Sequence, residues 1–259
     1  MSSSSVLDQI IEGVLADVQL RQKPISELIA RLPEAPQLRD AKGALSKKGT
    51  RLIAEVKRSS PSKGQLAEIA DPVALALKYQ KGGADVISVL TEQRRFNGSI
   101  ADLNHVRNSV TIPILRKDFI VTEFQVYESR LIGSDLILLI VAGLTKSQLT
   151  DYYQLATELG MSVLVEVHDE IEAARAVELK AEIIGINSRN LKTLEVSSKN
   201  FELIFPHLPA NVIKVAESGI SNRSQVEEVE RLGANAILVG ETLVTAINPE
   251  IKIKELLNR

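Results

Sequence analysis

The chain has 259 residues, and its content of 44% hydrophobic and 25% charged residues is that of an ordinary globular protein long enough to bury a substantial core. Its 31 basic and 33 acidic side chains give a net charge of −2, which argues against a broad basic surface for nucleic acid or an anionic membrane. Cysteine is absent, which excludes disulfides, thiol catalysis and cysteine-bound metals and is typical of a reducing cytoplasm.

The N-terminal part of the chain does not share the pattern of the rest. Ser2 to Ser5 are expected to form a loose tail. Apolar residues at helical spacing predict a helix over 6–21, and Pro24 and Pro33 interrupt the segment after it. Residues 42–50 are interpreted as a basic connector.

No sequence segment predicts export or membrane insertion. The N-terminus lacks the basic stretch of a secretory signal and carries acidic residues early. The longest wholly apolar run, 136–142, is far shorter than the roughly 20 residues that span a bilayer.

Beyond this part, short runs rich in β-branched residues and leucine recur, each followed by a segment with helical periodicity. Their spacing averages about 26 residues, which suits one strand–helix unit. The runs are apolar on both faces, as parallel strands covered by helices are. Strands are predicted to begin near Leu52, Val86, Ile114, Leu136, Ser162, Ile183, Ile213 and Ala236.

Helix boundaries agree with this interpretation. Asp71 followed by Pro72 is a typical helix start. Glycine pairs end several predicted helices just before the next strand, at Gly83, Gly133 and Gly233.

Eight strand–helix units predict an α/β fold, a single (βα)8 TIM barrel over residues 51–259. Residues 1–50 are expected to be an N-terminal helical extension packed on the barrel. An open doubly wound sheet is the alternative architecture. It is disfavoured because the first strand is followed by KRSSPSKG, which lacks the glycine-rich turn G-x-G-x-x-G of that fold.

Charged and polar residues occur where apolar strands should end, at the face that carries the active site in such barrels. A paired charge at a strand end explains any one of them, but two lysines and three glutamates at one face indicate a charge-balanced catalytic site. The polar groups at the strand ends are Glu55 and Lys57, then Arg116, Lys117 and Asp118, then Glu166, Asn187 and Arg189, and finally Glu217 and Ser218.

Two glycines after the last strands, Gly219 and Gly240, suggest a phosphate site built from backbone N–H groups. Glycine after a strand is common in α/β folds, so this signal is weak by itself. Glu241 beside Gly240 is compatible with a phosphate when its side chain points to solvent and its N–H faces the ligand.

The three histidines share no metal-ligand spacing, and no metal site is predicted. His168 follows a strand directly and is expected to face solvent in a turn. His105 and His207 are expected at the surface. Without a nucleophile elbow, a zinc-binding helix motif or a phosphate-binding P-loop, metal-free acid–base chemistry is the remaining class.

Six segments in order resemble the indole-3-glycerol-phosphate synthase family of tryptophan biosynthesis, and the likeness covers residues 6–257. They read IAEVKRSSPSKG, DVISVLTEQRRFNGS, PILRKDFIVTEFQVYESR, VLVEVHDE, IIGINSRNL and VAESGI. The resemblance implies a carboxy-lyase that closes a ring on 1-(2-carboxyphenylamino)-1-deoxyribulose 5-phosphate, releases CO2 and loses water to give indole-3-glycerol phosphate. It implies no cofactor and no metal.

The resemblance also implies roles for individual residues. Lys117 is the candidate acid for ring closure, Lys57 suits the substrate carboxylate, and Glu166 is the leading base with Glu55 beside it; which lysine acts in dehydration stays open. Asn187 and Ser218 are expected to orient the substrate.

Binding roles are implied for a second group. Arg189 suits anionic substrate groups, with an ion pair to Glu217 as the alternative. Pro61 and Phe96 are expected to border the aromatic ring, and the segment 59–65 to close over the substrate. The residues implied on the phosphate side are Ser60, Gly219, Gly240 and the backbone of Glu241.

Two other functions stay open: a different phosphate-binding barrel enzyme, such as a sugar-phosphate isomerase of histidine or tryptophan synthesis, and a non-catalytic binding barrel. The expected partner is a phosphorylated small molecule, with no nucleic acid and no membrane, and the protein is expected to act as a monomer in the cytoplasm.

Overall fold

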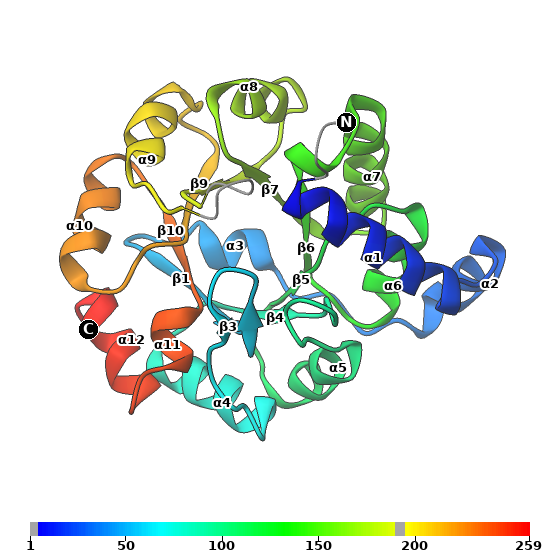
Figure 1. Ribbon diagram of the computed structural model, residues 1–259, viewed down its shortest axis with the longest axis horizontal. Helices are drawn as coiled ribbons and strands as arrows, with labels where there is room; N and C mark the ends of the chain where they lie inside the picture. The colour runs from blue at the N-terminus through cyan, green and yellow to red at the C-terminus, as the bar shows by residue number, and fades with distance from the viewer. Residues whose placement is uncertain (1–4, 190–194) are drawn as a thin grey trace.

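A closed barrel of eight parallel strands forms the centre of the computed structural model, which describes residues 5–189 and 195–259 (Figure 1). Seven strands begin at the predicted residue, and the first begins one residue earlier. The barrel strands are β1 (Arg51–Val56), β4 (Val86–Leu90), β5 (Ile114–Lys117), β6 (Leu136–Ile140), β7 (Ser162–Val167), β8 (Ile183–Asn187), β9 (Ile213–Glu217) and β10 (Ala236–Val239).

Closure is made by β1, which pairs in parallel with β4 on one side and with β10 on the other. This pairing confirms the barrel and rules out the open sheet. Because alternate residues point to the barrel interior and to the helices, nearly every strand residue is buried, which explains why the strands are apolar on both faces.

Helices surround the barrel as expected (Figure 1). Asp71 caps the first of them by accepting hydrogen bonds from the N–H groups of Val73 and Ala74. Gly83, Gly133 and Gly233 have φ values of 105°, 85° and 96°, so each predicted helix-end glycine adopts the left-handed conformation that terminates a helix. The helices are α4 (Pro72–Gly82), α5 (Ile100–Ser109), α6 (Glu123–Leu131), α7 (Lys146–Glu158), α8 (Glu170–Glu178), α9 (Lys199–Ile204), α10 (Arg223–Arg231), α11 (Glu241–Val244) and α12 (Pro249–Leu257), with 3-10 turns η2 (Val141–Gly143) and η3 (Phe205–His207).

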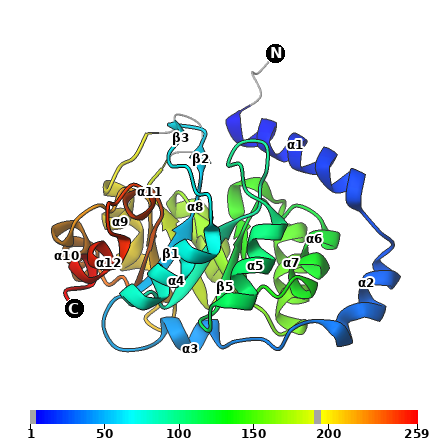
Figure 2. The same cartoon turned by 90° about the horizontal axis from the view of Figure 1, so that it is seen from below.

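The N-terminal extension runs along one side of the barrel from one end to the other (Figure 2). Helix α1 lies at the end where the strands finish, beside a hairpin of two short strands that comes after β1. Helix α3 lies at the opposite end. The extension comprises α1 (Val6–Arg21), α2 (Ile25–Arg31), the 3-10 turn η1 (Leu32–Glu34) and α3 (Ala41–Leu45), and the hairpin comprises β2 (Ser59–Ser60) and β3 (Gly64–Gln65).

Two expectations for the extension were wrong. Ser5 is not part of a loose tail: its hydroxyl accepts from the N–H of Asp8, whose carboxylate accepts from the N–H of Ser5, a capping box that starts α1. The expected tail residues before it lie outside the described part of the chain. The predicted connector begins as helix α3, because Asp40 caps it and Leu45 is buried beneath the barrel. Among the described residues, no helix is both long and apolar enough to cross a membrane.

Candidate active site

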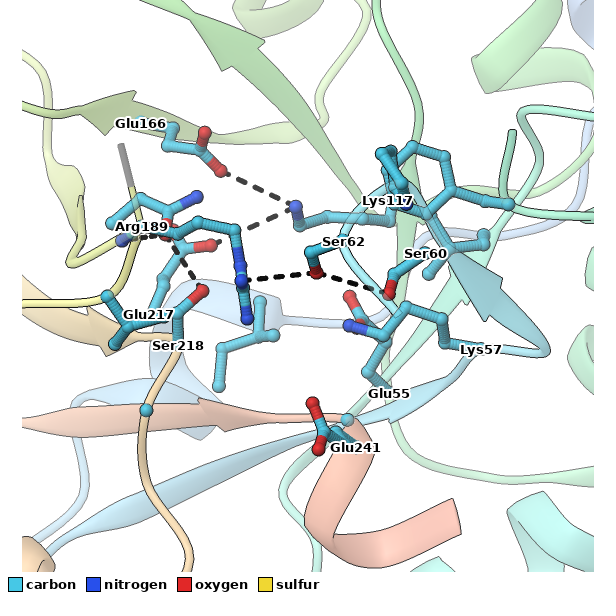
Figure 3. A pocket seen from close by; sticks show the side chains of 18 of the residues that line it. Glu55, Lys57, Ser60, Ser62, Lys117, Glu166, Arg189, Glu217, Ser218 and Glu241 are labelled. Carbon is cyan, nitrogen blue, oxygen red and sulfur yellow. Dashed lines mark hydrogen bonds and ion pairs between the residues drawn. The ribbon is translucent and has the colours of Figure 1, made fainter. Parts of the chain in front are cut away.

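A cavity of about 330 Å³ opens where the strands finish, at the mouth of the barrel (Figure 3). This volume is within the range of small-molecule sites. Every residue that the sequence singled out as catalytic or substrate-binding lines it. They are Glu55, Lys57, Ser60, Pro61, Phe96, Lys117, Glu166, Asn187, Arg189, Glu217, Ser218, Gly219, Gly240 and Glu241.

Lys117 lies between two carboxylates at the floor of this cavity. Its Nζ atom is 3.4 Å from Oε2 of Glu166 on β7 and 3.9 Å from Oε2 of Glu217 on β9. The lysine side chain is 16% exposed and each glutamate side chain 2%. Because so little water screens these charges, they determine one another's protonation.

The pKa of each group follows from burial and from its neighbours. Burial alone would lower the pKa of Lys117, but Glu166, Glu217 and Glu55 outweigh burial and raise it, so the ammonium form is favoured. Burial alone would raise the pKa of Glu166, but Lys117 and His168 hold it below its usual range. Burial and the nearby Glu166 carboxylate raise the pKa of Glu217 well above its usual value, which favours its protonated form.

A second ion pair, between Glu55 and Lys57, joins the end of β1 to the loop after it. Lys57 Nζ is 2.6 Å from Glu55 Oε1. The two residues share a face of the chain because they are two positions apart. A Cβ atom on Gly240 would lie 2.4 Å from Oε1 of Glu55 and 3.1 Å from Nζ of Lys57. Gly240 therefore makes room for this ion pair.

The ends of β8 and β9 hold a hydrogen-bonded pair. The Ser218 hydroxyl donates to Oδ1 of Asn187 at 2.8 Å, and the backbone N–H of Arg189 donates to the same oxygen at 3.0 Å. Ser218 and Gly219 have φ values of 68° and 77°, so the chain makes a left-handed turn directly after β9. The turn fixes the position of the Asn187 side chain at the mouth.

Contacts between loops close one side of the cavity. The guanidinium of Arg189 donates to the Ser62 hydroxyl at 3.2 Å, in the turn of the β2–β3 hairpin. Lys63 in the same turn lies 2.5 Å from Oε1 of Glu241 at the start of α11. The hairpin is thereby tied to the loops after β8 and β10. The Glu241 side chain is 37% exposed, and it pairs with Lys63 at this exposed position.

Comparison with known proteins identifies the family of this chain. A model of the family described as indole-3-glycerol phosphate synthase matches residues 7–256. The chain is 53% identical over 254 residues to the indole-3-glycerol phosphate synthase of Streptomyces griseus subsp. griseus, which covers 97% of this chain and 94% of that protein. The chain belongs to the indole-3-glycerol phosphate synthase family. It is also 52% identical over 258 residues to the Mycolicibacterium gilvum protein of that name, covering 99% of this chain and 95% of that one.

Solved structures with low identity share the fold. The 3-hexulose-6-phosphate synthase from Salmonella typhimurium superposes with a TM-score of 0.66 at 13% identity, over 81% of this chain and 97% of that chain. Thiamine phosphate pyrophosphorylase from Pyrococcus furiosus superposes with a TM-score of 0.61 at 17% identity, over 80% and 93%. At such identities the likeness establishes the barrel fold alone.

Some apolar residues that line the cavity were not identified as site residues from the sequence. Phe96 packs against Phe119, with ring centroids 6.0 Å apart, and Pro61 lies on the same cavity. Val6, Leu7 and Ile10 of helix α1 also line it. Their helical spacing was visible in the sequence, but the element against which α1 packs depends on the path of the whole extension.

Gly185 is a further residue that the sequence did not single out. It lies on β8 between Glu166 on β7 and Val215 on β9, and a Cβ atom there would be 2.0 Å from Oε1 of Glu217. The missing side chain provides the space for the Glu217 carboxylate. A glycine inside an apolar strand was the available signal, because such a glycine often marks a close approach.

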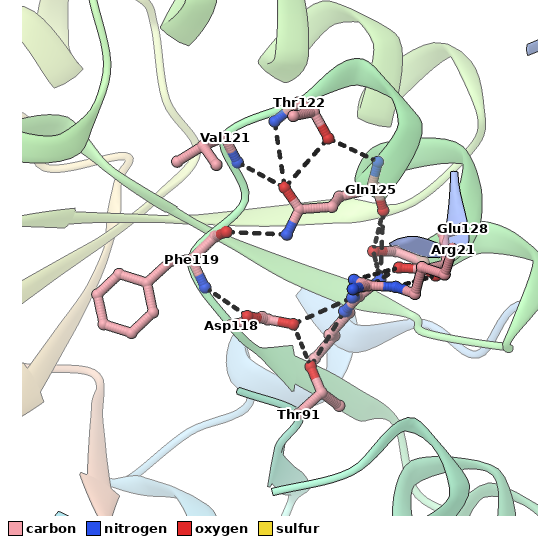
Figure 4. A network of polar contacts seen from close by, with 10 residues as sticks. Arg21, Thr91, Asp118, Phe119, Val121, Thr122, Gln125 and Glu128 are labelled. Atoms are coloured by element: carbon pink, nitrogen blue, oxygen red, sulfur yellow. Dashed lines mark hydrogen bonds and ion pairs between the residues drawn. The ribbon is translucent and has the colours of Figure 1, made fainter. Parts of the chain in front are cut away.

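The charged groups of Arg116 and Asp118 do not reach the cluster around Lys117. Alternation along β5 turns Arg116 outward, where its Nη2 lies 3.0 Å from Asp118 Oδ2 and 2.8 Å from Glu128 Oε2. Arg21 at the end of α1 lies 2.9 Å from Oε1 of the same Glu128 (Figure 4). This buried network joins α1 to the strand that carries Lys117.

His168 also differs from expectation. The side chain is 11% exposed instead of facing solvent, and its Nε2 atom lies 3.2 Å from Oε1 of Glu166. The strand alternation that turns Glu166 inward turns residue 168 to the same side. His105 and His207 are exposed as predicted. Glu217 has Lys117 as its ion-pair neighbour rather than Arg189.

Proposed function

We propose that the mouth of this barrel converts 1-(2-carboxyphenylamino)-1-deoxyribulose 5-phosphate to indole-3-glycerol phosphate, CO2 and water, the reaction of the family to which the chain belongs. The observation that carries the proposal is the lysine ammonium between two buried carboxylates, in a cavity with an apolar wall on one side and basic groups and glycines on the other. Ring closure needs an acid, dehydration needs an acid and a base, and this cluster supplies both types of group.

Lys117 is the acid for ring closure. The ring carbon that bears the carboxylate attacks the sugar ketone, and negative charge develops on the ketone oxygen. Because its pKa is raised by the surrounding glutamates, Lys117 holds its proton until that charge appears, and it stabilises the oxygen electrostatically before donating.

Glu166 is the base for dehydration. A carboxylate paired with an ammonium is a weak base, as its lowered pKa indicates. Once Lys117 has given its proton to the substrate oxygen, the positive charge of Lys117 is gone and the basicity of Glu166 increases. It then takes a proton from the carbon next to the nitrogen while the new hydroxyl leaves as water. The ion pair between Lys117 and Glu166 thus sets the order of the two steps: Lys117 donates its proton first, and Glu166 accepts one afterwards.

Lys57 faces the substrate carboxylate until CO2 departs, and Glu55 holds the Lys57 ammonium in place at 2.6 Å. Loss of CO2 removes the negative charge that Lys57 balanced. Lys57 is then free to donate a proton to the departing hydroxyl, with Glu55 as its partner.

The remaining lining residues bind the substrate. Asn187 and Ser218 orient its polar groups, Glu217 accompanies Lys117, and Pro61 and Phe96 border the aromatic ring. The phosphate lies on the opposite side, where the residues that contact it are Ser60, Arg189, Gly219, Gly240 and the backbone N–H of Glu241.

The experiment is direct. The purified protein is mixed with the carboxyphenylamino deoxyribulose phosphate, and indole fluorescence and CO2 release are followed together. Equal amounts of both products support the proposal. If the wild-type protein is folded by circular dichroism but produces no indole fluorescence or no CO2, the proposal is contradicted. That the protein acts as a monomer in the cytoplasm stays a prediction, and size-exclusion chromatography tests the monomeric state.

A further inference from the structure

The carboxylate of Glu166 has a cation on each of its two oxygens. Lys117 Nζ lies 3.4 Å from Oε2, and His168 Nε2 lies 3.2 Å from Oε1. The glutamate side chain is 2% exposed and that of His168 is 11% exposed. Two cations at opposite ends of a carboxylate restrict its rotation, because turning it would break one contact or the other.

The far side of the His168 ring is fixed as well. Its Nδ1 atom lies 3.1 Å from Oε2 of Glu172 in the first turn of α8, and the backbone N–H of His168 donates to that same oxygen at 2.8 Å. Asp169 caps α8 by accepting from the N–H of Glu172, and Asn200 of α9 donates to the carbonyl of His168. Helix α8 therefore sets the orientation of the ring.

Both ring nitrogens face carboxylate oxygens, which are acceptors. A neutral imidazole has one N–H donor and one acceptor nitrogen, so one of its two contacts would set a lone pair against a carboxylate. The imidazolium donates a hydrogen bond from Nδ1 to Glu172, and its positive charge at Nε2 lies 3.2 Å from the Glu166 carboxylate, a contact that is an ion pair and not a hydrogen bond. The geometry therefore calls for a charged ring.

We propose that His168, as an imidazolium held by Glu172, is a positioning residue that aims the Glu166 carboxylate at Lys117 and at the reacting atoms. The proposal rests on the function proposed above, because it assigns Glu166 the role of base. His168 is not among the residues that line the cavity, so it acts through Glu166 and does not touch the substrate.

The charges around the pair are consistent with this role. Glu166 is faced by Lys117 from β5, by Glu217 from β9 and by His168 from its own strand, and His168 is faced by Glu166 and Glu172. Burial alone would lower the pKa of His168, but the two carboxylates raise it to about 10. The ring thus stays charged at neutral pH, and it stabilises the fold until the pH rises through about 10.

The test compares His168→Gln with the wild-type protein and with His105→Gln, a matched change at an exposed histidine. We expect kcat of His168→Gln to fall by about 10–100-fold, the loss expected when a reacting group is misplaced by about 1 Å, with KM within about twofold. Losing the positive charge raises the pKa of Glu166, so the acid side of the kcat–pH profile should shift to higher pH. His105→Gln should leave kcat, KM and the profile unchanged.

Glu172→Gln is the second variant. It leaves His168 in the chain but removes the carboxylate on the far side of the ring, so kcat should fall in the same direction by a smaller factor. The proposal would be overturned if both variants had unchanged kcat and an unshifted acid side of the kcat–pH profile, while His168→Gln had a lower melting temperature. His168 would then have only a structural role.

A readout without substrate separates this proposal from the proposed function. Nitrogen NMR of the wild-type protein should show both ring nitrogens of His168 protonated at about pH 8, and Glu172→Gln should lower the pKa of the ring. A ring that is neutral at that pH would overturn the proposal even if the protein makes indole-3-glycerol phosphate. A protein that fails to make it, but whose ring is charged, would instead refute the proposed function.

Discussion

A Cβ atom on Gly185 would lie 2.0 Å from Oε1 of Glu217, so the side chain missing from β8 is the space that the carboxylate from β9 occupies. That oxygen is buried, and within the described residues it has no hydrogen-bond partner. Its neighbour on the other oxygen is Lys117, at 3.9 Å. The position of the Glu217 carboxylate therefore depends on a glycine as much as on an ion pair.

Gly185→Ala should reduce turnover by about 10-fold or more, since it displaces the Glu217 carboxyl beside the acid Lys117. The melting temperature should change little, because the atom that must move is the end of a flexible side chain. Steady-state kinetics and thermal melts measure both. Glu217→Gln and the double variant complete a double-mutant cycle. If Gly185→Ala acts through Glu217, the loss of turnover in the double variant should differ strongly from the sum of the two single losses. Additive losses would contradict the relationship.

Lys117→Ala should reduce kcat by about 10²–10⁴-fold, because the proton donor for ring closure is removed. Lys146→Ala on the exposed face of α7 is the matched control and should behave as wild type. A Lys117 variant with kcat within about threefold of wild type would remove this lysine from the mechanism.

The same variant should acquire a new pH dependence of stability. Without Lys117, the pKa of the Glu166 carboxyl in the folded protein should rise, because burial remains while one of the two cations that lower this pKa is gone. A carboxyl with a higher pKa in the native state binds its proton more tightly there, so the variant loses less stability than the wild-type protein as the pH falls. Chemical denaturation from about pH 7 to about pH 5 should therefore show Lys117→Ala gaining stability relative to the wild-type protein. If the difference in the free energy of unfolding between the two proteins did not change with pH, the Glu166 carboxylate would not be a buried charge that depends on Lys117.

Glu166→Gln should keep substrate affinity and the melting temperature while slowing turnover strongly, because the amide keeps the shape of the side chain but cannot accept a proton. The ring-closed, decarboxylated intermediate should accumulate, since proton removal belongs to dehydration. Rapid-quench analysis of single turnovers detects it. If Glu166→Gln turned over normally but melted several degrees lower, Glu166 would have a structural role and Glu55 would be the leading candidate for the base.

The two glycines assigned to the phosphate should respond differently. Gly219→Val introduces a side chain at φ 77°, where its Cβ would lie 2.8 Å from Val196, and should raise KM and weaken binding of inorganic phosphate. Gly240→Val should in addition lower kcat, because its Cβ would lie 2.4 Å from Oε1 of Glu55 and would disturb the ion pair with Lys57. Unchanged KM in both variants would show that the phosphate is bound elsewhere.

The sequence by itself determined the barrel and the residues at its mouth. Strand starts from Val86 to Ala236 could be located because a buried parallel strand must be apolar on both faces, a local property of five or six residues. A charge at the end of such a strand, as at Glu166, is costly unless it has a partner, so the cluster was visible before any contact was known.

Tertiary structure alone decided which of these groups face one another. The pairing of Lys117 with Glu166 and Glu217 depends on three strands meeting across a closed barrel, and alternation along β5 sends Arg116 the other way. His168 looked like a turn residue because its two carboxylate neighbours lie on the same strand and on the next helix, and the direction of its ring depends on how α8 packs. Electrostatic contacts of this kind depend on distance in space, which strand and helix periodicity do not specify.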